Sequence, residues 1–234
     1  MSDARRTRPI VAIDGPAGAG KSTVARRLAD DVGLVLVDTG ALYRGVALAA
    51  QRAHLAWTDE PSVGNLARSL VADQTLSFAR DATRGVRVQL SGEDVTDAIR
   101  AADIGMGAST VSANAAVRAA LLDLQRQAGL AGGVVLEGRD IGTVVFPDAD
   151  LKFFLTARPE IRAKRRFEEL AAKGAATTFE HTLAEVVRRD EQDTTRAVAP
   201  LRQAPDALLV DSSDMTIEQA LETIVGRVRA WRPR

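Results

Sequence analysis

The sequence predicts an α/β fold in which a mostly parallel sheet is flanked by helices. Residues 9–14 read PIVAID, a short β-branched apolar run that is typical of a buried strand. A glycine-rich loop follows, then residues 22–32 carry apolar side chains at helical spacing, and residues 34–37 form a second apolar run. This order of strand, loop, helix and strand is characteristic of a parallel sheet with crossover helices.

The remaining elements follow from the same reasoning. A helix is predicted at residues 41–51, and the middle of the chain then changes character. Short, partly alternating runs lie at 75–78, at 85–90 and around Val95, with turn-rich pieces at 80–85 and 91–94. They predict a small antiparallel sheet. The later elements are a helix at 114–129 with Val117, Leu121, Leu124 and Ala128 on one face, strands at 133–136 and 151–155, helices at 159–173 and 179–193, a strand at 207–210, and a helix at 217–231 whose core stripe is Leu221, Ile224, Val225 and Val228.

Composition narrows the possible functions. The 234 residues include 31 basic and 31 acidic side chains, so a zero net charge gives no support for a nucleic-acid polymer as partner. The absence of cysteine excludes disulfides and thiolate catalysis, and it fits a reducing, cytoplasmic location. With only His54 and His181, a histidine-rich metal cluster is excluded, and both are expected at the surface or in packing. Residues 1–8 are polar and basic, so a frayed terminus is expected, and no window is apolar enough to span a membrane.

Residues 15–22 read GPAGAGKS and match the phosphate-loop pattern G-x-x-x-x-G-K-[ST] between a predicted strand and a predicted helix. Backbone N–H groups must converge on phosphate oxygens there, and the helix N-terminus adds its positive dipole end. Lys21 can reach the β- and γ-phosphates of ATP, and the Ser22 hydroxyl can bind Mg²⁺. The residues predicted to hold the ATP phosphates are Gly15, Pro16, Ala17, Gly18, Ala19, Gly20, Lys21, Ser22 and Thr23.

The loop does not decide the reaction, because switch GTPases, motors and small-molecule kinases share it. The guanine-reading pattern N-K-x-D is absent, and the D-x-x-G at 30–33 falls where the first helix ends. The strand at 134–136 ends at Glu137, so a clear Walker-B aspartate is missing. Two roles remain open for Asp14 and Asp38. One of them could orient Mg²⁺ or the loop through water, or they could serve in turns at strand ends.

Three further segments suggest a second nucleotide. Residues 38–44 and 137–148 follow predicted strands, where ligands bind in open α/β sheets, and residues 188–201 lie nearer the C-terminus. Together they supply an aromatic ring, several arginines and carboxylates. Arginines suit the phosphate of an acceptor nucleotide, and an aspartate or arginine suits its base.

These motifs, in this order, resemble the bacterial cytidylate kinase family of phosphate-loop nucleoside monophosphate kinases, which use ATP to phosphorylate CMP and dCMP. The resemblance runs from about residue 10 to 228, and its most specific parts are GRDIGTVVFPDA at 138–149 and the RD…DTTRAVAPL run at 189–201. Thr39 stands where many relatives have serine, and Glu137 where some have aspartate.

The resemblance implies a domain organisation and a set of site residues. It implies one kinase domain with a core at about 8–45 and 130–234, an inserted antiparallel module for the monophosphate at about 46–129, and a helical lid at about 158–190; the chain is expected to be a monomer. The catalytic residues would be Lys21, Arg139, Arg189 and Arg196. The CMP residues would be Thr39, Tyr43, Arg44, Ser109, Arg118, Arg139, Asp140, Arg189 and Asp193. The ATP-side lid residues would be Arg162, Arg165 and Arg166.

The base assignment has a physical reason. Cytosine carries an amino donor where uracil carries a carbonyl, so a buried Asp140 can accept from cytosine and would repel uracil. Arg118 complements the hydrogen-bond acceptors O2 and N3 of the cytosine ring. A kinase for UMP, dTMP or a small metabolite is the alternative within the same class, and a nucleotide-sensing switch is the alternative from another class. The arginines at 162–166 and 188–189 could also be solvated helix faces, Tyr43 an ordinary packed ring, and Asp140 a turn residue.

Overall fold

The computed structural model describes residues 6–81, 85–172 and 174–233. The chain divides into two compact units, the first formed by residues 1–34 and 133–234 and the second by residues 35–132. Residues 82–84 of the predicted turn, Lys173 at the end of a predicted helix, and residues 1–5 of the N-terminus lie outside the described residues.

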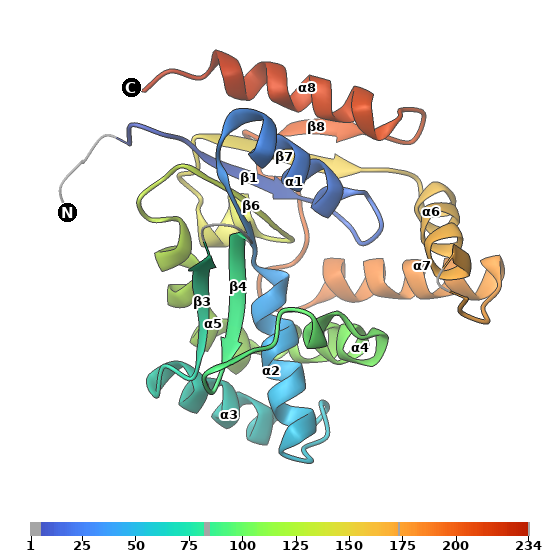
Figure 1. Cartoon of the computed structure of the whole chain (residues 1–234). Coiled ribbons are helices and arrows are strands. Elements are labelled where there is room, and N and C mark those ends of the chain that lie inside the picture. Colours follow the sequence, from blue (N-terminus) through green and yellow to red (C-terminus); the bar gives the residue numbers. More distant parts are fainter. Residues whose placement is uncertain (1–5, 82–84, 173, 234) are drawn as a thin grey trace. The chain divides into compact units, whose positions relative to one another are not determined.

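The first unit carries the strands and helices expected at both ends of the chain (Figure 1). Its elements are β1 (Ile10–Asp14), α1 (Lys21–Val32), β6 (Val134–Gly138), the one-turn π-helix η2 (Ile141–Val145), β7 (Leu151–Thr156), α6 (Pro159–Ala172), α7 (Phe179–Thr195), β8 (Leu208–Asp211) and α8 (Ile217–Ala230).

Within the first unit, the strands of the main sheet lie in the order β6-β1-β7-β8. β1 pairs in parallel with β6 and β7, and β7 pairs in parallel with β8, which confirms the predicted α/β class. All five residues of β1 are buried, as expected of a central strand covered on both faces. Helices α1 and α8 pack against each other, and the stripe from Leu221 to Val228 on α8 is buried as predicted. The carboxyl ends of β1, β6 and β7 therefore meet at one edge of the sheet.

The second unit contains the predicted small antiparallel sheet. β3 (Leu76–Asp81), β4 (Gly85–Leu90) and β5 (Glu93–Asp94) pair in that order. The other elements of this unit are β2 (Val35–Asp38), α2 (Gly40–Arg52), α3 (Glu60–Ala72), the 3₁₀ turn η1 (Ala98–Arg100), α4 (Ala102–Val111) and α5 (Ala115–Gly129). One apolar cluster, which includes Leu42, Leu76, Ile104 and Leu121, holds this unit together.

The structure differs from the sequence-based expectation in several elements. Helices α3 and α4 were not predicted. On α5 the buried face runs through Val117, Leu121, Gln125 and Gly129, so Leu124 and Ala128 are only partly buried. β6 continues to Gly138, so Glu137 lies inside the strand and does not follow it.

Candidate functional site

The phosphate loop joins β1 to α1 in a backbone conformation that only glycine can adopt at key positions. Gly15 has a φ of 151°, and a β-carbon there would lie 1.9 Å from the carbonyl oxygen of Leu155 on β7. Gly20, the N-cap of α1, has a φ of 89° and offers no side-chain cap. No acidic residue occupies the first turn of α1. The backbone N–H groups at this helix start are thus available to an anion, with the positive dipole end behind them.

Lys21 is nearly enclosed, with 6% of its surface exposed, and its Nζ donates to the carbonyl of Pro16 at 2.8 Å. Burial and then the charge of Arg139 together lower the pKa of the Lys21 ammonium to about 7, although Glu137 acts in the opposite direction. An anion close to the amine would offset both effects. Lys21 is therefore a cation kept in a poorly solvated place, which suits a group that neutralises phosphate charge.

Ser22 and Glu137 form a polar pair beside the loop. The Ser22 hydroxyl donates to Glu137 Oε2 at 2.8 Å, and Glu137 is buried at the end of β6. Glu137 lies 115 residues from Ser22 along the chain, so the sequence alone does not reveal this pair. A hydroxyl and a carboxylate are oxygen donors of the kind that Mg²⁺ prefers. Thr23, the next residue of the helix, is exposed.

Three of the predicted arginines gather around carboxylates in the first unit. Arg139 Nε donates to Asp193 Oδ2 at 2.8 Å, and Arg196 lies 3.7 Å from Asp193 and 3.6 Å from Asp140. Burial favours the neutral carboxyl of Asp193, but the charge and hydrogen bond of Arg139 outweigh it together with the charges of Arg189 and Arg196, so the pKa of Asp193 is lowered. The charge of Arg189 also acts on both Asp193 and Lys21. Positive charge is thus concentrated next to the phosphate loop.

The arginines of α6 have different surroundings from one another. Arg162 is 3% exposed, and its Nη1 donates to the carbonyl of Ala17 in the loop at 3.0 Å and to Asp190 of α7 at 2.9 Å. The interpretation of this segment as a solvated face is therefore wrong for Arg162. Arg165 bonds to Ser212, whereas the exposed Arg166 pairs with Glu169 on its own helix.

The second unit holds the other predicted acceptor residues. The guanidinium of Arg118 lies 5.4 Å from the ring centroid of Tyr43, a cation–π arrangement, and donates to the carbonyl of Ser112. Arg44 Nη1 donates to the carbonyl of Ile99 at 3.3 Å. Tyr43 packs in the apolar cluster, so its ring is also a packing residue. Thr39 is the buried N-cap residue of α2, and Ser109 is partly buried on α4.

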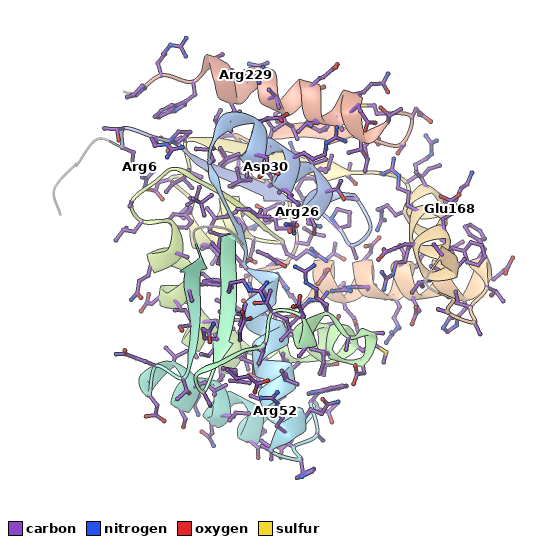
Figure 2. All side chains as sticks on the ribbon, in the orientation of Figure 1. Arg6, Arg26, Asp30, Arg52, Glu168 and Arg229 are labelled. Atoms are coloured by element: carbon purple, nitrogen blue, oxygen red, sulfur yellow. The ribbon has the colours of Figure 1, made fainter. Side chains whose placement is uncertain are left out.

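Other candidate features have no place in such a site. Asp30 and Arg26 lie on the exposed side of α1, so the D-x-x-G pattern at 30–33 belongs to a solvated helix end (Figure 2). His54 and His181 are exposed, as predicted. Within residues 6–81, 85–172 and 174–233, no group of three histidine or acidic side chains is arranged to hold a metal ion. No helix in the described part of the chain is long and apolar enough to cross a membrane.

A glycine loop with a lysine and with arginines beside it is typical of enzymes that transfer phosphoryl groups. The class of this protein is accordingly a phosphotransferase of the phosphate-loop type. A family model described as cytidylate kinase matches residues 11–230. The chain belongs to the cytidylate kinase family.

The curated relatives cover nearly the whole chain. A cytidylate kinase from Geobacter sp. strain M21 is 52% identical over 229 residues, which are 98% of this chain and 96% of the relative. One from Pseudomonas aeruginosa strain UCBPP-PA14 is 51% identical over 217 residues, 93% of each chain. Among solved structures, an uncharacterized protein from Eubacterium ventriosum ATCC 27560 has a TM-score of 0.51 at 13% identity, with 96% of this chain and 100% of that chain covered. This last likeness supports the fold alone.

Proposed function

We propose that the protein transfers the γ-phosphoryl group of ATP to CMP or dCMP and releases ADP and CDP or dCDP. The observation that carries the proposal is the concentration of Arg139, Arg189 and Arg196 near Lys21 in the first unit. A hydrolytic switch needs a water-positioning residue at its phosphate loop, whereas an acceptor with its own phosphate needs additional cations. The choice of CMP or dCMP as the acceptor is inferred from the family relationship.

On the donor side, residues 15–23 would hold the ATP phosphates, and Lys21 would neutralise charge that develops on the transferring group. Mg²⁺ would bind with ATP, and the Ser22 hydroxyl would be its protein ligand, oriented by Glu137. Arg162, Arg165 and Arg166 would belong to a lid at about 158–190 that excludes water, because water would otherwise compete with the acceptor. The contact of Arg162 with the carbonyl of Ala17 supports a place beside the donor phosphates.

On the acceptor side, Arg44, Arg139 and Arg189 would hold the phosphate of CMP, and Tyr43 would pack along the nucleotide. Ser109, Arg118 and Asp140 would face cytosine, with Thr39 nearby and Asp193 on the ribose. The monophosphate-binding insert at about 46–129 would supply part of this set. The acceptor needs no general base, because its second phosphate pKa is about 6 and its oxygen is largely ionised at pH 7. Catalysis would then rest on positioning and charge stabilisation.

The test is ATP consumption with Mg²⁺ across CMP, dCMP, UMP, AMP, GMP and dTMP. Turnover stimulated by CMP and dCMP alone supports the proposal. Stimulation by UMP, dTMP or another acceptor would keep the kinase and remove the cytosine assignment. Slow hydrolysis that ignores every acceptor would favour a nucleotide-sensing switch instead. Lys21→Ala should abolish transfer with little loss of fold, and retained turnover would exclude Lys21 from the mechanism.

The base assignment has its own experiment. Asp140→Asn should weaken the use of CMP and relax discrimination against UMP, because an amide can donate to the uracil carbonyl. Asp30→Asn, an exposed change on α1, is the matched control. Unchanged preference for CMP in Asp140→Asn would contradict the assignment. A monomeric state and a cytoplasmic location complete the proposal, and sedimentation of the purified protein tests the first of these.

A further inference from the structure

Asp14 is a buried carboxylate to which the proposed chemistry gives no task. It ends β1, directly before the first glycine of the phosphate loop, and only 4% of its surface is exposed. Each of its oxygens accepts one backbone N–H, Oδ1 from Ile141 at 2.8 Å and Oδ2 from Gly142 at 2.7 Å. The Asp14 carboxylate therefore accepts two charge-assisted hydrogen bonds, from residues 127 and 128 positions further along the chain.

The two N–H groups open the η2 turn, which follows immediately after Arg139 and Asp140. The N-cap of this turn, Asp140, makes no side-chain cap hydrogen bond, so Asp14 satisfies donors that the turn itself leaves open. A β-carbon at Gly142 would crowd Cδ of Lys152 at 3.1 Å, whereas its distance of 3.4 Å from Asp14 Oδ2 is an ordinary contact.

We infer that Asp14 is a positioning residue that fixes the segment carrying Arg139 and Asp140 relative to the phosphate loop. Since Asp14 precedes Gly15 with no intervening residue, any shift of the η2 turn is resisted at the loop itself. Arg139 is bonded to Asp193 and Asp140 lies beside Arg196, so the turn is held from two sides. This inference rests on the proposed function, because it assigns Arg139 and Asp140 to the acceptor.

The surroundings of Asp14 make its grip sensitive to pH. The pKa of Asp14 is raised to about 6, mainly by burial and also by the charge of Asp140. The two N–H bonds and the charge of Lys21 on α1 lower it. Lys152 of β7 directs its amine to Asp206 instead. A protonated carboxyl has an O–H where an acceptor is needed, so one hydrogen bond to the turn is lost as the pH falls through about 6.

The experiment compares Asp14→Asn with Asp150→Asn. Asp150 accepts the N–H of Ile10 at 2.8 Å, at the opposite end of β1. The control therefore weakens a similar bond far from Arg139, together with an ion pair to Arg6 at 3.5 Å. In Asp14→Asn we expect the KM for CMP to rise roughly tenfold and kcat to fall by a similar factor, with the KM for ATP changed much less. Below pH 6 the wild-type activity should fall more steeply than that of Asp14→Asn, because only the phosphate of CMP still titrates there in the variant; Asp150→Asn should keep the wild-type steepness.

If both variants lose only thermal stability and keep the wild-type KM for CMP and pH profile, the positioning role is overturned. A measurement on the wild type avoids variants that fail to fold. The chemical shift of the Gly142 amide proton should change with pH, with a midpoint near pH 6. A flat titration of that amide would also overturn the inference. If the wild type fails to phosphorylate CMP while the amide titrates as expected, the proposed function fails and the contact made by Asp14 stands.

Discussion

Arg139 donates its Nε to Asp193 Oδ2 at 2.8 Å, so the residue that follows β6 is tied to the last turns of α7. Both residues are predicted to serve the acceptor, and Arg196 lies 3.7 Å from the same carboxylate. One aspartate thus keeps two arginines close together in a partly buried place. Removal of its charge should leave these cations to repel each other.

Asp193→Ala should therefore destabilise the protein by about 3 kcal/mol at pH 7, near the range seen when one partner of a buried ion pair is removed. The pKa of Asp193 is lowered in the folded state, so its contribution is complete above its ordinary value and is lost as the pH falls through the folded value. Urea unfolding at pH 7 and at pH 3 measures both effects. An equal loss at the two pH values would contradict the electrostatic explanation.

The sequence was sufficient for the elements whose signal is local. The apolar run of β1, the glycines of the loop and the stripe of α8 each occupy one short window, and all were found where expected. The sequence of α3 does contain a helix signal, namely the cap residue Asp59 and the helical spacing of Val63, Ala67 and Leu70, which are buried. α4 was harder to recognise, because Gly105 and Gly107 lower helix propensity in its interior.

The candidate site was predictable in its residue types and not in its contacts. Lys21 and Ser22 follow from a motif, but the partner of Ser22 lies at Glu137 and the partners of Asp14 lie beyond residue 140. Arg162 looks like a surface arginine in sequence and is buried, because Asp190 on the neighbouring α7 neutralises it. Such pairings depend on how strands and helices are ordered in space, and spacing along one sequence does not encode that order.

Two glycines of the phosphate loop should respond differently to alanine. Gly15→Ala places a β-carbon 1.9 Å from a backbone oxygen of β7, which no side-chain movement can relieve. Gly20→Ala meets only Ile217 Cδ1 at 3.9 Å, so its cost is the positive φ alone, about 1–2 kcal/mol. Thermal unfolding should show a far larger loss for Gly15→Ala, or no folded protein. Similar losses for the two variants would contradict the close approach to Leu155.

Gly105 should control the placement of Arg44 in the second unit. A β-carbon at Gly105 would lie 3.1 Å from Arg44 Nη1, the atom that donates to the carbonyl of Ile99. Gly105→Ala should push the guanidinium aside and raise the KM for the acceptor by about fivefold. Steady-state kinetics with CMP measures this effect.

Two other glycine variants separate this effect from general damage. Gly226→Ala, which meets nothing within 4 Å on α8, should leave the KM unchanged and stabilise the helix slightly. Gly107→Ala, whose β-carbon would lie 2.4 Å from the Trp57 ring, should instead destabilise the unit and alter tryptophan fluorescence. An unchanged acceptor KM in Gly105→Ala would exclude Arg44 from the acceptor set or show that it adapts freely.

The lowered pKa of Lys21 predicts that ATP binding takes up a proton. With a pKa of about 7, Lys21 is mostly neutral at pH 8, and phosphates beside it favour the ammonium form. Binding at pH 8 should therefore take up about 0.9 proton per ATP, and binding at pH 6 about 0.1. ATP affinity should fall as the pH rises above 7. Calorimetry in buffers with different ionisation enthalpies measures the uptake directly.

Two variants at the same position test whether Lys21 is the group that takes up the proton. Lys21→Met removes the titrating group, so uptake at pH 8 should vanish and the weakened binding should lose its dependence on pH. Lys21→Arg keeps a permanent charge and should also bind without uptake, because the guanidinium remains protonated. Uptake that persists in Lys21→Met would assign the proton to another group or to the nucleotide. Burial is the largest cause of the lowered pKa of Lys21. Proton uptake confined to the wild type would therefore mean that the ATP phosphates reach the enclosed amine. They would supply the negative charge that its surroundings lack.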